Sequence, residues 1–137
     1  MKKTLKQKSI LDIIKAESIF DIKCGDNKEN VIEKFENIDF KSRKKKSEEL
    51  ISYGNIEFSF YNSILESIHI EKNKQNTIKI IDFEDFNDSQ LNQFLQKNNI
   101  DYKKSNDVYY INKGKVSLTL VNGNLEDITI LDKELFI

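Results

Sequence analysis

The 137-residue chain holds 22 Lys and Arg against 23 Asp and Glu, and its net charge of -1 gives no overall electrostatic reason to bind nucleic acid or an anionic membrane. Its one cysteine excludes an internal disulfide framework, and a chain of this length can bury a hydrophobic core without metal or disulfide support. With 10% aromatic and 33% charged residues, the composition predicts one folded domain over residues 1–137 with a densely charged surface.

The first predicted element is a helix over residues 4–17. Four apolar residues recur on one side of it: Leu5, Ile10, Ile13 and Ile14. The lysines around its start resemble those of a signal peptide, but charged residues at positions 12, 15 and 17 leave no uninterrupted apolar stretch of roughly seven residues. No other run approaches the roughly 20 apolar residues that a membrane-spanning helix needs. We therefore expect a cytoplasmic protein that is not attached to a membrane.

The rest of the chain predicts an α+β fold of two tandem copies, about residues 18–72 and 78–131, each a helix followed by a three-stranded antiparallel meander. A shift of 60 positions aligns similar residues along both copies. The aligned pairs include Asn27 with Asn87, Phe35 with Leu95, Gly54 with Gly114, Phe58 with Leu118, and Ile68 with Ile128. Two unrelated meanders with similar propensities are the alternative. Because a solenoid needs more repeats, two copies predict one pseudo-symmetric domain.

Each copy begins with a short predicted helix. In the first copy Asn27 or Asp26 caps the helix, and the apolar residues at helical spacing are Val31, Ile32 and Phe35. In the second copy Asn87 and Asp88 stand at the start, and the corresponding residues are Leu91, Phe94 and Leu95. Ahead of each helix lies a β-prone run, residues 18–22 and 77–83, that is a candidate edge strand.

The strand register follows from the alternation of side chains between the two faces of a sheet. A two-residue turn at 54–55 and three-residue loops with a bulge at 62–64 and 122–124 bring the apolar residues to one face, although Asn122-Gly123 also signals a tighter turn. The predicted inner face, which should contact the helices, holds Ile51, Ile56, Phe58, Phe60, Ile68, Ile70, Tyr109, Ile111, Val116, Leu118, Leu120, Ile128 and Ile130. The predicted outer face is mixed and includes Glu57, Tyr61, Leu65, His69, Leu125 and Asp127. Such a face suits either solvent or a protein partner.

The sequence predicts no catalytic residue, cofactor or metal site. Cys24 and His69 are the only residues of their types, and a nucleophilic Cys-His pair is not expected because Cys24 precedes a helix whereas His69 lies on the outer face. No paired His or Cys ligands stand at zinc spacing, and the scattered glycines form no phosphate-binding loop. The acidic residues between positions 82 and 88 lack the central glycine of a calcium loop.

Two charge clusters are candidates for contact with a partner. Residues 41–46 hold five positive charges and are predicted to be a loop, either solvated or in contact with phosphates. The acidic cluster consists of Asp82, Glu84, Asp85 and Asp88, with Phe83 and Phe86 between the charges. Such a cluster suits a surface that binds a basic partner, because charges steer the encounter and rings supply affinity. The alternative is a helix N-terminus, where acids stabilise the helix dipole.

Three segments carry a family resemblance: residues 22–27 (IKCGDN), 53–58 (YGNIEF) and 64–70 (ILESIHI). They resemble small immunity proteins of bacterial polymorphic or contact-dependent toxin systems, and the helix-plus-sheet units are similar to those of the β-lactamase inhibitory protein. The likeness spans most of residues 19–130. It implies an inhibitor that occludes the active site of its partner, and it assigns no catalytic residue to this chain.

The leading functional hypothesis is a stoichiometric inhibitor that binds and masks a cognate bacterial toxin, for example a basic nuclease. The expected partner-binding residues are Asp82, Glu84, Asp85, Asp88, Glu57, Tyr61 and His69. The alternative is a nucleic-acid-binding accessory protein that uses the basic 41–46 loop. An enzyme is the least favoured hypothesis.

Overall fold

The computed structural model describes residues 9–35 and 41–135, which form three helices and ten strands. The helices are α1 (Ile10–Ala16), α2 (Lys28–Glu33) and α3 (Asp88–Lys97). The strands are β1 (Ser18–Ile19), β2 (Ile22–Lys23), β3 (Lys41–Lys45), β4 (Glu48–Tyr53), β5 (Ile56–Tyr61), β6 (Ile64–Glu71), β7 (Tyr102–Ser105), β8 (Val108–Ile111), β9 (Val116–Val121) and β10 (Asn124–Leu131). The predicted α+β class, with a mainly antiparallel sheet, is confirmed.

The strands β3 to β10 form one antiparallel sheet in the order β3-β4-β5-β6-β10-β9-β8-β7. Each half is a meander of four strands rather than the three that were expected, because β3 and β7 add to the two outer edges. Neither strand has the alternation of apolar residues that predicts a strand from sequence. Each is held mainly by backbone pairing to one neighbouring strand, which no side-chain pattern reveals. Residues 41–45, expected to belong to a loop, are therefore an edge strand, where lysine is common.

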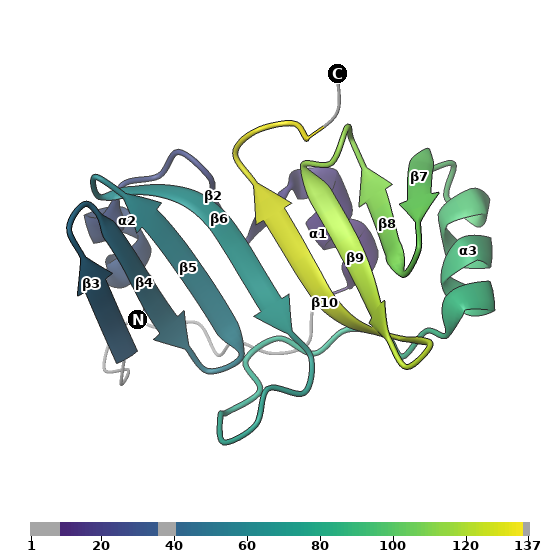
Figure 1. The fold of residues 1–137 in the computed structure, drawn as a ribbon, viewed down its shortest axis with the longest axis horizontal. Coiled ribbons are helices and arrows are strands. Elements are labelled where there is room, and N and C mark those ends of the chain that lie inside the picture. The colour runs from purple at the N-terminus through teal and green to yellow at the C-terminus, as the bar shows by residue number, and fades with distance from the viewer. Residues whose placement is uncertain (1–8, 36–40, 136–137) are drawn as a thin grey trace.

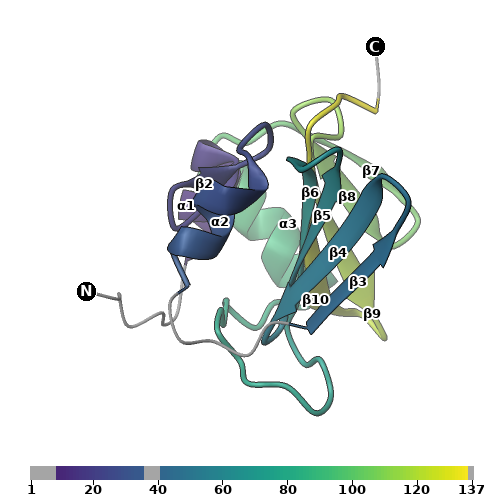
Figure 2. The ribbon, with the colours of Figure 1, turned by 90° about the vertical axis from the view of Figure 1, so that its left-hand side faces the viewer.

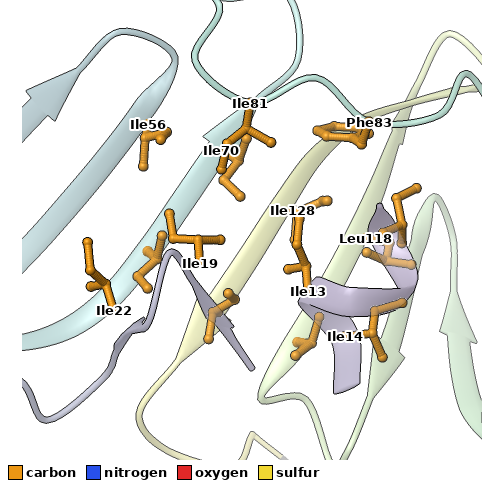
Figure 3. Packing of buried hydrophobic residues seen from close by; sticks show 14 of the residues in the cluster. Ile13, Ile14, Ile19, Ile22, Ile56, Ile70, Ile81, Phe83, Leu118 and Ile128 are labelled. Carbon is orange, nitrogen blue, oxygen red and sulfur yellow. The ribbon is translucent and has the colours of Figure 1, made fainter. Parts of the chain in front are cut away.

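All three helices lie on one face of the large sheet, together with the hairpin β1-β2, and no described helix lies on the other face (Figures 1 and 2). The buried residues form one hydrophobic cluster between these layers. Figure 3 shows Ile13 and Ile14 of α1 over Ile128 and Leu118 of the sheet. Every residue predicted for the inner face is buried, and that part of the prediction is confirmed. None of the described helices is long and apolar enough to cross a membrane.

The predicted strand register is confirmed, but the predicted three-residue loops are wrong. Phe58 pairs with Ile68 and Leu118 pairs with Ile128, as expected. However, Tyr61 pairs with Ile64 across a two-residue turn, and the extra residue lies inside β6 and β10 as a β-bulge. In this register Leu65 and Leu125 stand opposite Phe60 and Leu120, whose side chains face the core. Leu65 and Leu125, expected on the outer face, are therefore fully buried, and the bulge that follows restores the predicted pairing.

The segment between β6 and α3 is not a strand, contrary to the expectation for residues 77–83. Its backbone is held by the side chain of Asn55, which is 1% exposed. The amides of Ile80 and Ile81 donate to Asn55 Oδ1 at 2.8 and 3.2 Å, and Asn55 Nδ2 donates to the carbonyl oxygen of Ile81 at 2.8 Å. An asparagine side chain therefore takes the place that a neighbouring strand would occupy.

The helix starts agree with the sequence where they are described. The side chains of Asn27 and Asn87 accept hydrogen bonds from the amides of Asn30 and Gln90, which confirms both predicted caps. Helix α1 begins at Ile10 after the cap residue Ser9, and positions 4–8 of the predicted 4–17 helix lie outside the described residues. Residues 18–23 form the separate hairpin β1-β2 instead of an edge strand of the large sheet.

Candidate protein-binding face

The face of the large sheet opposite the helices, called the open face below, is acidic at its centre. The four middle strands β5, β6, β10 and β9 contain five carboxylates and no lysine or arginine. The carboxylates are those of Glu57, Glu66, Glu71, Glu126 and Asp127. They sit on the open face because the inner positions of these strands are filled by buried apolar residues.

At the centre of the open face, His69 of β6 lies between two carboxylates from neighbouring strands. Its Nδ1 is 3.4 Å from Oε1 of Glu57, the residue directly opposite on β5. Its Nε2 is 3.7 Å from Oδ1 of Asp127 on β10. All three side chains are about one-third exposed or less. The other oxygen of Glu57 accepts a hydrogen bond from Lys74 at 3.1 Å. We call Glu57, His69 and Asp127 the central triad.

Asp127 is the least satisfied member of the central triad. It stands directly opposite Glu71 in the pairing of β10 with β6, and like charges in directly opposed positions destabilise a sheet. Its Oδ1 is the only buried side-chain polar atom among the described residues without a hydrogen-bond partner. Its close ion-pair contact is with His69, 3.7 Å away, so the charge of Asp127 is compensated mainly when His69 is protonated.

Contacts within the central triad shift the pKa values of His69 and Glu57. The Asp127 carboxylate raises the pKa of His69, burial lowers it, and Glu57 raises it further, so that the pKa lies above its ordinary value of 6.5. Partial burial raises the pKa of Glu57, but hydrogen bonds and charges from Lys74 and His69 outweigh burial and lower it. Protonated His69 is thus favoured in the folded state.

We expect the NMR titration of His69 to show this effect directly, because it is the only histidine in the chain. Asp127→Asn should lower the measured pKa of His69 more than Glu57→Gln, since Asp127 contributes most to the shift. A folded pKa above 6.5 means that His69 contributes stability below pH 6.5, and that this contribution disappears as pH rises through the folded pKa. A pKa at or below 6.5 in the native protein would contradict this arrangement.

The acidic cluster predicted from the sequence does not form one surface. Asp82 and Asp85 meet at the buried amine of Lys72, at 3.0 and 3.2 Å. Glu84 instead accepts from the amide of Ile10 at the start of α1, 3.1 Å away. Asp88, the first residue of α3, accepts from Lys104 at 2.8 Å and also from the hydroxyl of Tyr109. These contacts fit the helix-terminus interpretation of Glu84 and Asp88.

Of the predicted outer-face contacts, Glu57 and His69 are brought together, whereas Tyr61 lies apart at the end of β5. Tyr61 is 50% exposed and pairs with Ile64, which is 43% exposed. Together they place apolar surface at the end of the open face where β5 turns into β6. Asp127 was expected on the outer face but not among the binding residues, and neither Glu71 nor Lys74 was expected to contribute. The pairing of β10 with β6 brings Asp127 to Glu71, and Lys74 reaches Glu57 from the irregular segment after β6.

Cys24 lies on the helical side of the sheet, away from the central triad, and packs against the core. Its thiol lies 3.8 Å from the carbonyl oxygen of Ile130, and burial, followed by the charge of Asp132, raises its pKa to about 12. Such a thiol stays protonated and is a poor nucleophile. Within the described residues, no group of three His, Cys, Asp or Glu side chains is placed to hold a metal ion.

Comparison of the chain with protein-family models, with curated proteins and with solved structures found no match. The function is therefore inferred from the chemistry of the open face.

Proposed function

We propose that this protein is a stoichiometric inhibitor that binds and masks a basic partner protein through the open face of its sheet. The observation that carries the proposal is the group of five carboxylates, without a lysine or arginine, on the four central strands of the face that no described helix covers. A lysine or arginine of a partner would be attracted to these carboxylates and would relieve the repulsion between Asp127 and Glu71, which stand directly opposite each other. The resemblance to immunity proteins supports a bacterial toxin, such as a nuclease, as the partner class.

The acidic centre matches a basic partner in two ways. Five carboxylates on four adjacent strands attract a cationic surface over several ångströms and accelerate the encounter. Tyr61 at the end of β5 and Val121 at the end of β9 are exposed, and they add apolar and aromatic area at opposite ends of the open face that a close contact would bury.

We also propose that the two meanders are copies of one unit, shifted by 60 positions. Strands β5 and β6 begin at residues 56 and 64, and β9 and β10 begin at residues 116 and 124. A bulge lies near the start of both β6 and β10. His69 pairs with Thr129, its own equivalent, so a pseudo-twofold axis would pass between them. The duplication would make one wide binding sheet from a small unit.

The proposal predicts that two substitutions of the same shape weaken partner binding. Glu57→Gln with Asp127→Asn removes two negative charges without changing side-chain size, and the dissociation constant should rise at least about tenfold. Co-expression with the product of the adjacent gene, followed by affinity capture, growth rescue and calorimetry, would measure the loss. The loss should be smaller at high salt, because ions screen partly exposed charges.

A matched control is Glu29→Gln on α2, which removes one carboxylate from the helical side of the protein. It should leave binding unchanged. At a pH above the folded pKa of His69, where its ion pair with Asp127 no longer contributes, stability should not fall in Asp127→Asn, since the substitution relieves the repulsion with Glu71. Equal binding by the double variant and the native protein would refute the open face as the interface. Failure of the native protein to capture the co-expressed product or rescue growth would count against inhibition of that product.

A further inference from the structure

The edge strand β3 leaves backbone hydrogen-bonding groups without a neighbouring strand. It stands at one end of the large sheet, and among the described strands it pairs only with β4. Strands at a sheet edge can accept a further strand from another chain. Only alternate residues of β3 direct their amide and carbonyl groups away from β4.

The hydrogen-bond alternation in the adjacent strands shows which residues these are. The amide of Asn62 donates to the carbonyl oxygen of Ser47 at 2.9 Å, in the register that continues β5 against β4. Tyr53 and Ile56 flank a two-residue turn, which places them in a hydrogen-bonded pair of the same phase. Odd-numbered residues of β4 therefore direct their backbone groups toward β5.

The even-numbered residues of β4, positions 48, 50 and 52, consequently direct their backbone groups toward β3. Their partners on β3 are Lys45, Arg43 and Lys41. The two remaining residues of the strand, Ser42 and Lys44, must direct their amide and carbonyl groups away from the sheet. The edge thus offers two donors and two acceptors at the spacing of an extended chain.

The side chains of this edge select the charge of an added strand. Arg43, the only arginine in the sequence, and Lys44, Lys45 and Lys46 are all exposed. Among the described residues, none of these four cations forms an ion pair, and they follow one another without an intervening acid. Arg43, Lys44 and Lys45 also line a hollow of about 710 Å³ that reaches Ser59 of β5, and Glu48, Glu49 and Glu66 lie on its other sides. The cations form the side of the hollow at the sheet edge, and the edge is continuous with the open face.

The opposite edge of the sheet differs in this respect. Strand β7 lies next to α3 (Figure 1), and two of its side chains are tied to that helix. Lys104 is bound to Asp88 at 2.8 Å, and the hydroxyl of Tyr102 accepts from Asn92. The charges of β7 are thus partly neutralised within the chain, whereas those of β3 are available to a partner.

We propose that β3 binds an acidic, extended segment of a partner protein by adding it to the sheet as a further strand. The segment would pair with the backbone of Ser42 and Lys44 and place carboxylates beside Arg43 and Lys45. A second copy of this chain is a poor occupant, because two such edges would bring eight cations together. A nucleic acid would satisfy the charges but not the row of backbone donors and acceptors. This inference does not depend on the proposed inhibitor function.

The test uses a short synthetic peptide that alternates Glu with Thr, compared with the same peptide carrying Lys in place of Glu. The native protein should bind the first and not the second, with amide shifts at Ser42 and Lys44 in NMR spectra. Lys44→Pro removes one outward amide without removing a bond to β4, so the fold should tolerate it. It should weaken binding at least about tenfold more than Lys44→Ala, which removes the same charge.

Two further ligands test the proposal even if Lys44→Pro disturbs the strand. A peptide with methylated amides along one edge keeps its charge but cannot pair, and it should bind at least about tenfold more weakly. A single-stranded oligonucleotide of similar charge should bind no better than the methylated peptide. No binding of the acidic peptide would mean that the cations only protect the edge from aggregation. Oligonucleotide binding as tight as that of the unmethylated peptide would instead assign β3 to nucleic acid, and either result overturns the proposal.

Discussion

Replacement of Asn55 by Ala should lower the free energy of unfolding by about 3–5 kcal/mol, because it leaves several buried backbone groups without partners. Asn55 accepts from the amides of Ile80 and Ile81, and it donates to the carbonyl oxygens of Glu71 and Ile81 at 3.0 and 2.8 Å. Urea unfolding would measure the change, which corresponds to a fall of roughly 10–20 °C in melting temperature for a chain of this size.

The matched control is Asn73→Ala. Asn73 donates to Glu126 at 2.7 Å, but in an exposed contact, so its loss should cost less than about 0.5 kcal/mol. Asn55→Asp should be at least as harmful as Asn55→Ala, because it removes the donor and brings negative charge next to two carbonyl oxygens. A loss below about 1 kcal/mol for Asn55→Ala would show that the 72–87 segment does not depend on this side chain.

Lys72→Met should be the second most damaging substitution, with a loss of about 2–3 kcal/mol, since it leaves a buried carbonyl oxygen without its charged donor. Lys72 is 5% exposed, and its amine donates to the carbonyl oxygen of Phe83, lies 4.6 Å above the Phe83 ring, and contacts Asp82 at 3.0 Å. Methionine keeps the apolar stem of the side chain but none of these contacts. Urea unfolding at several pH values would measure the effect.

The pH dependence of the stability loss in Lys72→Met separates two contacts of Lys72, the ion pair with Asp82 and the hydrogen bond to the carbonyl oxygen of Phe83. Burial raises the pKa of Asp82, but Lys72 and then Lys79 lower it below its ordinary value of 3.8. The lowered pKa means that the Asp82 contribution is present above pH 3.8 and lost as pH falls through the folded pKa. The difference between Lys72→Met and the native protein should therefore narrow in acid. Lys79→Met, at a contact of 3.7 Å with 41% exposure, should cost under about 0.5 kcal/mol at any pH.

The strand register was predictable because side chains alternate with period two, and a single coherent apolar face admits one solution. The loops were not predictable by the same argument. A three-residue loop and a two-residue turn followed by a bulge give the same pairing of Phe58 with Ile68, so parity cannot distinguish them. The error appears only in the residues between turn and bulge, which is why Leu65 and Leu125 were assigned to the wrong face.

Part of the candidate site was within reach of the sequence. The register that pairs Phe58 with Ile68 also places Glu57 opposite His69, and the structure confirms this contact. Asp127 joins them only because β10 pairs with β6, an association between strands far apart in the chain that no local pattern specifies. Lys72 and Asn55 were hidden for a related reason: their partners lie in an irregular segment whose path depends on those same contacts.

The position of β10 has a consequence for how the protein is made. It follows β7, β8 and β9 in the chain, yet it occupies the middle of the sheet beside β6. On the ribosome the first meander can form early, but one side of β6 then stays uncovered until residues 124–131 have emerged. An apolar strand that waits in this way is a site for mistaken pairing between nascent chains. The seam between the two halves is thus the step at which synthesis rate and chaperone supply should matter most.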